Sequence, residues 1–395
     1  MALEVDDNRS DDSRTGNDGP QQGNEIRILD SLAGVGPQDW NAFAAGHPFL
    51  RHEFLHALHE TGCASERSGW LPQFITLWRR GEFAGAMPLY VKGHSYGEYV
   101  FDWAWADAYH RSGLKYYPKL LSAVPFSPVT GPRLLAADAA ARAHLIGAAL
   151  GIARQVSSLH VLFPTASEAS ELATAGMLLR RNVQFHWNNH GYPDFDAFLA
   201  ELSSAKRKKI RRERRRVAEA GVTFRRLVGD EIRDEDWQFF AHCYEGTYRA
   251  HGSSPYLNLA FFRRIGATMP AHLLLVVAKL DGRPLASALN VFSADVLYGR
   301  YWGAVGQVPM LHFETCYYQA LEFCIERGIR VFEGGAQGEL KLSRGFLPVE
   351  TWSAHWLKHP EFSDAVQRFL ERESAGIERY VDELNDRSPF RDARS

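Results

Sequence analysis

The segment EGGAQGELKLSRG, residues 333–345, combines several glycines with charged side chains directly after a strand-like apolar run. Glycines allow a close backbone approach, and the start of a following helix can receive an anion. Lys341 and Arg344 are three residues apart, so on a helix they share a face and can hold a phosphate or a carboxylate. Glu333 and Glu339 are candidates for a general base. The alternative is a tight strand-to-helix connection with solvated charges.

The groups of this segment can bind an anion, accept a proton and donate backbone hydrogen bonds to a developing negative charge. Backbone amides beside Gly335 are candidate oxyanion donors, and Gly335 and Gln337 are candidate substrate contacts.

A second candidate region is FDWAWAD, residues 101–107, which we interpret as the end of a β-strand over residues 96–107. Asp102 has aromatic neighbours, and a buried carboxylate must be paired or shift its pKa, so Asp102 is a candidate base near neutral pH. Trp103 and Trp105 are candidate walls of a substrate site. The alternative places both tryptophans in the core.

A proline-rich stretch and one histidine complete the candidate substrate contacts. Residues 116–135 contain four prolines, so this stretch cannot be regular structure throughout. It suits the rigid wall of a cleft, with Lys119 and Arg133 as anion contacts, and it suits an ordinary ordered connection equally well. His312 begins a predicted helix over residues 311–327, where it can orient a substrate or cap the helix.

The electrostatics are dominated by KRKKIRRERRR, residues 206–216, which has nine basic residues and one acid and therefore a charge of +8. The whole chain carries −2, so the other residues sum to −10. Ile210 and Val217 lie on one side of a predicted helix over residues 203–220. Like charges four residues apart destabilise a helix, which favours an anionic partner. The candidate anion contacts are Lys206, Arg207, Lys209, Arg211 and Arg212.

The elements that must position these groups repeat one order in two halves of the chain. In each half a predicted hairpin is followed by a third strand with aromatic residues. These elements are 73–78, 83–91 and 96–107 in the first half, and 271–280, 285–292 and 295–305 in the second. FDWAW and RYWGA then occupy equivalent places. Strands that alternate with helices predict mixed α/β halves, each with a central sheet.

Length favours two domains, and the composition is that of a globular protein. The predicted divisions are a disordered acidic tail (1–25), a first domain (26–190), a second domain that includes the basic helix (191–385), and a short tail (386–395). The chain starts without a secretory signal, and no apolar run is long enough to span a membrane. The four cysteines suit neither zinc nor a disulfide framework. The expectation is a cytoplasmic protein without a metal.

Several long segments resemble one bacterial family. They are residues 54–73, 89–135 and 311–328, and FEGGAQGELKLSRGFLPVETWSAHW at 332–356. Over residues 45–385 the chain is similar to predicted N-acyltransferases that are also named peptidoglycan biosynthesis or recognition proteins. The resemblance implies a tandem of acetyltransferase-like (GNAT) folds, similar to the Fem-type enzymes that move an aminoacyl group from tRNA to an amine of a cell-wall precursor. Other members of the superfamily use acyl-coenzyme A.

Two departures from these relatives bear on the chemistry. The family often has His where this chain has Leu340, so no catalytic role is placed at Leu340. Acetyltransferases carry an R/Q-x-x-G-x-G/A phosphate loop after the third strand, whereas GAVGQVPML at 303–311 has only scattered glycines. This difference weighs against a simple acetyl-coenzyme A enzyme and favours aminoacyl-tRNA or another donor.

The sequence therefore predicts an N-acyltransferase of two GNAT-like α/β domains, with acyl-coenzyme A or aminoacyl-tRNA as donor. The acceptor is the amine of a cell-wall precursor or of another small molecule. The predicted active site is a cleft between the region of Asp102 and the region of Lys341, with Asp102, Glu333 or Glu339 as the base. The basic helix is expected to meet the donor, a tRNA or the anionic inner face of the membrane. The alternative function is a non-catalytic module that binds a cell-wall precursor or another anionic ligand.

Overall fold

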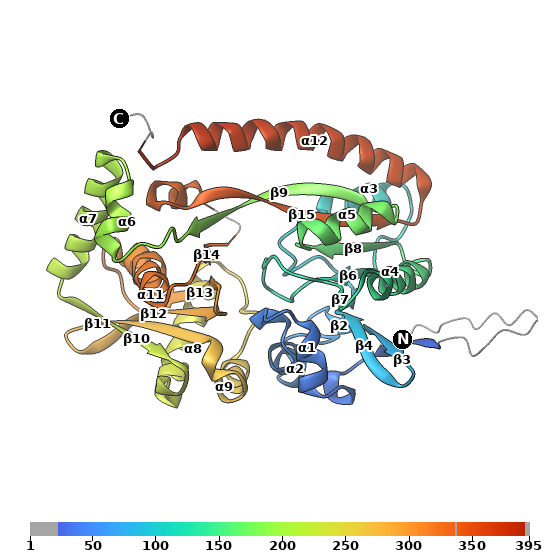
Figure 1. The fold of residues 1–395 in the computed structure, drawn as a ribbon, viewed down its shortest axis with the longest axis horizontal. Helices are drawn as coiled ribbons and strands as arrows, with labels where there is room; N and C mark the ends of the chain where they lie inside the picture. The colour runs from blue at the N-terminus through green and yellow to red at the C-terminus, as the bar shows by residue number, and fades with distance from the viewer. Residues whose placement is uncertain (1–22, 336–337, 392–395) are drawn as a thin grey trace, which may run out of the picture.

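A computed structural model describes residues 23–335 and 338–391. The fold is mixed α/β, as predicted, and is built around one sheet that runs through both halves of the chain (Figure 1). From the second half inward, its strands are β10 (Val222–Val228), β11 (Leu273–Leu280), β12 (Arg283–Phe292), β13 (Val296–Ala304), β14 (Val331–Glu333) and β9 (Leu178–Asn188). The order continues with β15 (Leu347–Leu357), β8 (Ser158–Leu162), β6 (Lys119–Ser122), β5 (Tyr90–Lys92) and β2 (Leu71–Pro72).

A smaller sheet belongs to the first half, and helices cover both sheets. The smaller sheet has the order β1 (Asn24–Leu29), β3 (Phe74–Arg79), β4 (Glu82–Met87) and β7 (Leu135–Ala136). The helices of the first half are α1 (Pro37–Phe43), α2 (His52–Glu60), α3 (Trp103–Arg111), α4 (Ala139–Ala153) and α5 (Ala166–Thr174). Those of the second half are α6 (Phe195–Glu201), α7 (Ser204–Glu219), α8 (Asp234–Ala250), α9 (Leu259–Thr268), α10 (Leu311–Phe313), α11 (Gln319–Arg327) and α12 (Pro360–Asp386).

The two halves exchange their last strands. The last strand of the first half, β9, pairs with β14 of the second half through residues 186–188. The last strand of the second half, β15, pairs with β8 of the first half through residues 353–357. Between these contacts β9 and β15 pair with each other, residues 178–186 against residues 347–355. Helix α12 lies along the exchanged pair (Figure 1). The predicted division near residue 190 falls directly after β9.

Both predicted hairpins are present. Strand β3 is antiparallel to β4, and β11 is antiparallel to β12. The second hairpin turns at Asp281 and Gly282, whose φ angles are 49° and 75°. An Asp-Gly pair favours such a turn because both positions need positive φ. The predicted helix over residues 311–327 is also present, but a π-helical turn at Glu314–Tyr318 divides it into α10 and α11.

The predicted strand over residues 96–107 is wrong. The chain forms a loop there and then helix α3, so FDWAW is not equivalent to RYWGA. The third strand of the first half is β6, which lies parallel to β8 as β13 lies parallel to β14. The error has a physical cause, because three alternating residues do not distinguish a strand from one helical turn. Trp105 and Tyr109, four residues apart, bury one face of α3 against α12.

The predicted tails are partly structured. Residues 1–22 lie outside the described part of the chain, but Asn24 and Glu25 already pair with β3 as part of β1. At the other end, Phe390 forms a bridge with Leu202, and the backbone N–H of Ser203 donates to the carbonyl of Pro389. The first described and last described residues are therefore anchored to the fold.

The strand exchange predicts that the two halves do not fold apart. We expect residues 26–190 alone to aggregate, because β9 and the edge of β8 would lack their partners. Co-expression with residues 191–391 should give a soluble complex of the two pieces. Size-exclusion chromatography and circular dichroism measure both outcomes, and a monomeric, folded first half would contradict the prediction.

Candidate functional site

Strands β13 and β14 open a pocket in the second half of the sheet. They are parallel and pair only between Val296–Tyr298 and Val331–Glu333. Beyond this contact β13 continues along β12 to Ala304, whereas the chain leaves β14 at Gly334. The two strands therefore part, and a pocket of about 490 Å³ lies at the opening.

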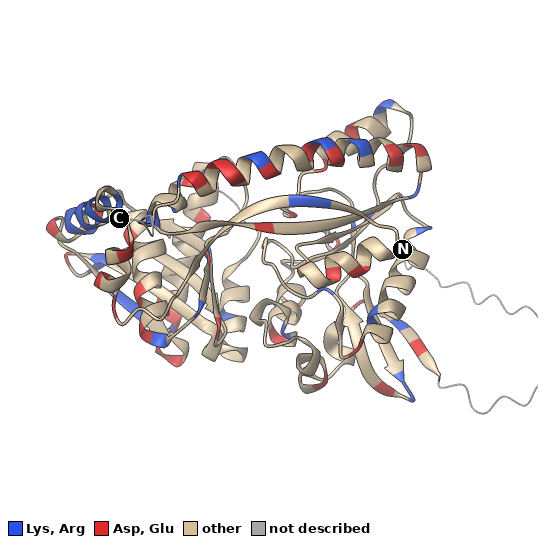
Figure 2. Cartoon of the chain, turned by 45° about the horizontal axis from the view of Figure 1, so that its top comes forward, with Lys and Arg blue, Asp and Glu red and all other residues tan. Residues whose placement is uncertain are grey.

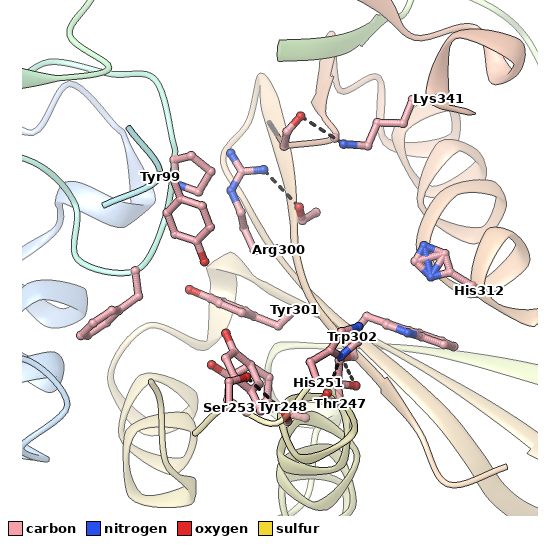
Figure 3. Close-up of a pocket in the computed structure, with 16 residues that line it drawn as sticks. Tyr99, Thr247, Tyr248, His251, Ser253, Arg300, Tyr301, Trp302, His312 and Lys341 are labelled. Atoms are coloured by element: carbon pink, nitrogen blue, oxygen red, sulfur yellow. Dashed lines mark hydrogen bonds between the residues drawn. The ribbon is translucent and has the colours of Figure 1, made fainter. Parts of the chain in front are cut away.

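The walls of the pocket come from both halves of the chain (Figure 3). Its lining residues are Tyr99, Phe126, Pro128, Tyr244, Thr247, Tyr248, His251, Ser253, Gly299, Arg300, Tyr301, Trp302, His312, Gly334, Gly335 and Lys341. The first three belong to the first half. The others belong to α8 and the loop that follows it, to β13, to α10, to the segment after β14 and to η6, a 3-10 helix over Glu339–Arg344. The lining is mainly aromatic, with a few cationic and polar groups, as in many ligand sites.

Arg300 is the fixed charge of the pocket. Its Nη2 donates to Glu333 Oε2 at 2.7 Å, and its Nη1 donates to the carbonyl oxygens of Gly299 and Glu333 at 3.1 Å each. Its Nε donates to Ser127 Oγ at 3.2 Å. Burial raises the pKa of Glu333, and the Arg300 guanidinium opposes this rise. Glu333 is thus an ion-pair partner that holds Arg300 in place.

Lys341 is the titratable group of the pocket. It lies on η6 and is 6% exposed, and its Nζ donates to the carbonyl oxygen of Gly335 at 3.1 Å. Burial, together with the smaller effect of the nearby Arg300 charge, lowers the pKa of the Lys341 ammonium to about 7. No carboxylate of the described residues forms an ion pair with Lys341. A large fraction of Lys341 is therefore the free amine at neutral pH, and a free amine can accept a proton.

Helix α8 supplies the aromatic wall. Tyr244 and Tyr248 are four residues apart and therefore share a face of α8. The helix approaches β13 closely because a side chain is missing at Gly303, where a Cβ would lie 2.0 Å from the carbonyl oxygen of Cys243. Tyr301 of β13 completes this wall, and burial keeps the pKa of its hydroxyl well above the usual value. These neutral side chains can stack on a ligand or donate hydrogen bonds to it.

His312 lines the pocket on the side of the π-helical turn. Its ring lies 5.0 Å from that of Trp302 in an edge-to-face arrangement. Burial lowers the pKa of His312 to about 4, with the positive charges of Arg344 and Lys341 as further causes. His312 is therefore neutral at physiological pH.

Asp102 and Lys119 lie in a buried cluster of the first half and not at the pocket. Lys119 Nζ is 2.5 Å from Asp102 Oδ2 and 2.8 Å from Glu98 Oε2. Burial alone would raise the pKa of Asp102, but Lys119 and His160 outweigh this effect and hold it well below the usual value. A paired carboxylate with a lowered pKa does not fit a base near neutral pH. Sequence reasoning recognised that a buried Asp102 needs a partner but could not identify Lys119.

The two predicted tryptophans also lie away from the pocket. Trp103 is 42% exposed and packs its ring 5.2 Å from that of Tyr96. Trp105 is buried, with its ring 4.9 Å from that of His355. The structure therefore does not bring the region of Asp102 to Lys341, and Tyr99 is the nearest part of this loop that lines the pocket.

Arg133 and Arg344 are fully engaged inside the protein. Arg133 is 0% exposed, and its guanidinium donates to carbonyl oxygens, among them those of Leu162 and Val129. Arg344 is 1% exposed and donates to both oxygens of Glu213, at 2.9 and 2.8 Å. Lys341 and Arg344 thus point to different partners, although they are three residues apart on η6.

The remaining predicted residues of this segment divide between the pocket and the surface. Gly335 lines the pocket, whereas Gln337 lies outside the described residues. Glu339 is exposed and forms surface contacts with Tyr380 and Arg387. Leu340 is 63% exposed and is not a lining residue, so the His that the family often has at this position would not lie in the pocket either.

Lysine and arginine residues are concentrated along the basic helix α7 (Figure 2). Glu213 is buried against Arg344, and Arg214 pairs with Glu314 and Glu322. Of the five predicted anion contacts, three have partners within the protein: Arg207 with the carbonyl of Ala200, Lys209 with Ser343, and Arg211 with Asp196. Four cations of α7 have no hydrogen bond or ion pair within residues 23–335 and 338–391, namely Lys206, Lys208, Arg212 and Arg216. These four cations are free for an anion.

A serine in G-x-S-x-G spacing, Ser95 between Gly93 and Gly97, stands in the loop after β5. This spacing occurs in the nucleophile elbow of serine hydrolases. Ser95 is buried, however, and its hydroxyl accepts a hydrogen bond from Lys119 Nζ at 2.7 Å. The two carboxylates beside Lys119 raise its pKa against the effect of burial, so Lys119 cannot act as a base for Ser95. This serine is part of the buried cluster and not an activated nucleophile.

Sequence reasoning missed the centre of the pocket. Arg300 was seen only as part of an aromatic strand, and the tyrosines of α8 were not considered. An arginine inside a strand that is otherwise small or aromatic was the available signal. A charge in such a strand needs a partner or a ligand.

The chain is a transferase of mixed α/β fold with two acetyltransferase-like halves. The family model described as FemAB-like, peptidoglycan biosynthesis/recognition, matches residues 31–392, and the chain belongs to this family.

Two solved structures show the same fold, and a third matches with a lower TM-score. The crystal structure of FemX is 14% identical, with 83% of this chain and 98% of that chain covered and a TM-score of 0.53. L-PGS from Bacillus licheniformis is 10% identical, with 88% and 99% covered and a TM-score of 0.50. A tandem GNAT protein from the clavulanic acid biosynthesis pathway is 11% identical, with 86% and 99% covered and a TM-score of 0.43. A comparison with curated proteins gave no match.

Neither a metal-binding cluster nor a membrane-spanning helix is found among the described residues. Within residues 23–335 and 338–391, no group of three or more His, Cys, Asp or Glu side chains could hold a metal ion. Within the same residues, no helix has the length and apolar character needed to cross a membrane.

The Glu213–Arg344 pair predicts a large effect on stability. Arg344→Met leaves the Glu213 carboxylate buried without its partner, so we expect the free energy of unfolding to fall by about 3–5 kcal/mol. The double variant Glu213→Leu/Arg344→Met removes both charges and should regain most of this loss. Urea denaturation measures the effect, with the exposed Arg215→Met of the same helix as control. A wild-type midpoint for Arg344→Met would refute a structural role.

Proposed function

We propose that this protein transfers an aminoacyl or other acyl group from an anionic carrier directly to an amine in the pocket between β13 and β14. One observation carries the proposal. Lys341 has a pKa of about 7 and, among the described residues, no carboxylate partner. It lines the pocket where β13 and β14 part, together with Arg300, whose position is fixed by Glu333. A proton acceptor and a positive field are what aminolysis of an activated acyl group requires.

The proposed reaction has two steps. The free amine of Lys341 takes a proton from the acceptor ammonium, and the resulting amine attacks the acyl carbonyl carbon. The charge of Arg300 and the backbone beside Gly335 stabilise the tetrahedral oxyanion. The bond between the carbonyl carbon and the carrier then breaks, and the Lys341 ammonium gives its proton to the leaving atom. The acceptor nitrogen, which still carries one proton too many, releases it to the regenerated Lys341 amine and from there to solvent, so that a neutral amide results. Glu333 positions Arg300, so the base role moves from the predicted carboxylates to Lys341.

Aminoacyl-tRNA is the proposed donor. The cations of α7 that have no partner among the described residues form a cationic docking surface for an anion, and α7 packs directly on η6, which carries Lys341. Two contacts make this connection: Lys209 with Ser343, and Glu213 with Arg344. A polyanion bound along α7 therefore lies next to the segment that bears the proposed base. The family membership supports an amine of a cell-wall precursor as the acceptor. We place the reaction in the cytoplasm, at the inner face of the membrane if the acceptor is lipid-linked.

Substitution of Lys341 tests the base. Lys341→Ala is expected to lower kcat for transfer by about 10²- to 10⁴-fold, while Lys358→Ala, which replaces an exposed lysine directly after β15, leaves it unchanged. The rate of the wild type should rise with pH through about 7, because the deprotonated amine is the active form. Steady-state kinetics with a radiolabelled acyl group measure both effects. A pH profile that is the same in Lys341→Ala would exclude this role.

Neutralisation of α7 tests the donor. The triple variant Lys208→Gln/Arg212→Gln/Arg216→Gln should weaken tRNA binding and reduce the dependence of log affinity on log salt by about 2. The matched control replaces three exposed arginines of α12, Arg368, Arg372 and Arg379. Filter binding with aminoacyl-tRNA at several salt concentrations gives the slopes. Equal slopes for the wild type and the α7 variant would reject tRNA docking on α7, and efficient transfer from acyl-coenzyme A by both proteins would reassign the donor.

A further inference from the structure

A small inner cavity of about 140 Å³ lies behind the main pocket, between β12, β13, β14 and the π-helical turn. It shares Gly299, Arg300, Trp302 and His312 with the main pocket. Its own walls are Ala288 and Asn290 of β12, Cys316 and Tyr317 of the π-helical turn, and Phe332 of β14. The inner cavity therefore adjoins the proposed active site and shares part of its lining.

Asn290 is the unusual residue of this cavity. It is 1% exposed, and its Nδ2 is buried without a hydrogen-bond partner in the described part of the chain. A buried side-chain amide that lacks a partner is destabilising and uncommon in folded proteins. Its two N–H groups therefore remain available to an acceptor on a ligand.

The backbone around Asn290 makes room for the amide. The pairing of β12 with β13 shifts register between Leu289 and Asn290, and such bulges redirect side chains next to functional sites. The residue opposite Asn290 is Gly299, where a Cβ would lie 2.9 Å from the Phe332 ring and 3.4 Å from Asn290 Oδ1. The bulge and the glycine together leave space where an ordinary strand pair would be filled.

The size and charge of the inner cavity limit its ligand. An apolar protein cavity of roughly 150 Å³ holds a molecule of the size of benzene, so about six non-hydrogen atoms fit here. The lining of the described residues contains no carboxylate, and Arg300 is already paired with Glu333. A cationic side chain would lie there without a counterion, which is costly. A small neutral group with a hydrogen-bond acceptor satisfies both limits.

We propose that the inner cavity binds the side chain of the transferred acyl group and that Asn290 selects a short, neutral, hydroxylated one by donating to its hydroxyl oxygen. This inference rests on the proposed function, since it places the acyl group of the donor in the inner cavity, next to the pocket that Lys341 lines. A seryl-type group fits, a lysyl group lacks a counterion, and a phenylalanyl group exceeds the volume. An alanyl group fits but leaves the Asn290 amide unpaired.

Binding of unreactive donor analogues tests the assignment without requiring turnover. The probes are 3′-amino-3′-deoxyadenosine amides that carry seryl, alanyl, lysyl or phenylalanyl groups, and isothermal titration calorimetry measures their affinities. We expect the wild type to bind the seryl amide at least tenfold tighter than each of the others. Equal affinity for all four amides, or no binding of any, overturns the inference. The proposed function is judged separately, from transfer by Lys341→Ala.

Substitutions in the inner cavity test which residues determine the selectivity between the amides. Asn290→Leu keeps the shape but removes the donor, so it should abolish the preference for seryl over alanyl amide while the melting temperature stays equal or rises. Ala288→Val partly fills the inner cavity and should weaken both amides at least tenfold. Ala286→Val, a buried alanine of the same strand outside the cavity, is the matched control and should weaken neither. An unchanged seryl preference in Asn290→Leu overturns the assignment, and if that variant does not fold, the wild-type series alone decides.

Discussion

The antiparallel pairing of β9 with β15 is the contact on which the rest of the molecule depends, because it joins two half-sheets into one. The pairing also reaches the pocket. The carbonyl of Phe185 in β9 accepts the backbone N–H of Gly334, at the point where the chain leaves β14. A strand from the first half therefore fixes the place where two strands of the second half part. A Cβ at Gly334 would lie 3.2 Å from that carbonyl oxygen, so a glycine suits this crossing.

The two halves use equivalent parallel strand pairs in different ways. Beside β6 and β8, Lys92 and Lys119 face Glu98 and Asp102 in a buried cluster of two cations and two carboxylates. Within the described part of the chain, Glu98 Oε1 and Asp102 Oδ1 have no hydrogen-bond partner. Beside β13 and β14, Arg300 pairs with Glu333, and Lys341 has no carboxylate partner among the described residues. Burial lowers the pKa of both Lys92 and Lys341 to about 7, but of the two it is Lys341 that lines the pocket, and the proposed function therefore uses the second half.

The features that could be predicted from the sequence are those that short-range residue patterns and turn residues determine. The Asp281-Gly282 turn, the end of α11 at Gly328 and the helix of the basic run all follow from local rules. The exchange of β9 and β15 was not predictable, because both strands have ordinary strand patterns whichever neighbour they take. The same holds for the site. Lys341 was found from its glycine-rich segment, but whether Lys341 or Arg344 faced the pocket depended on Glu213, which is 131 residues away from Arg344.

The strand exchange also sets an order of events during synthesis on the ribosome. Strand β8 ends at Leu162, but its partner in β15 begins only at Ser353. The first half leaves the exit tunnel long before the strand that completes it has been translated. Contacts so distant in sequence close late and slowly. The first half must therefore persist with an open edge at β8 until β15 has emerged, and its part of the sheet is completed only then.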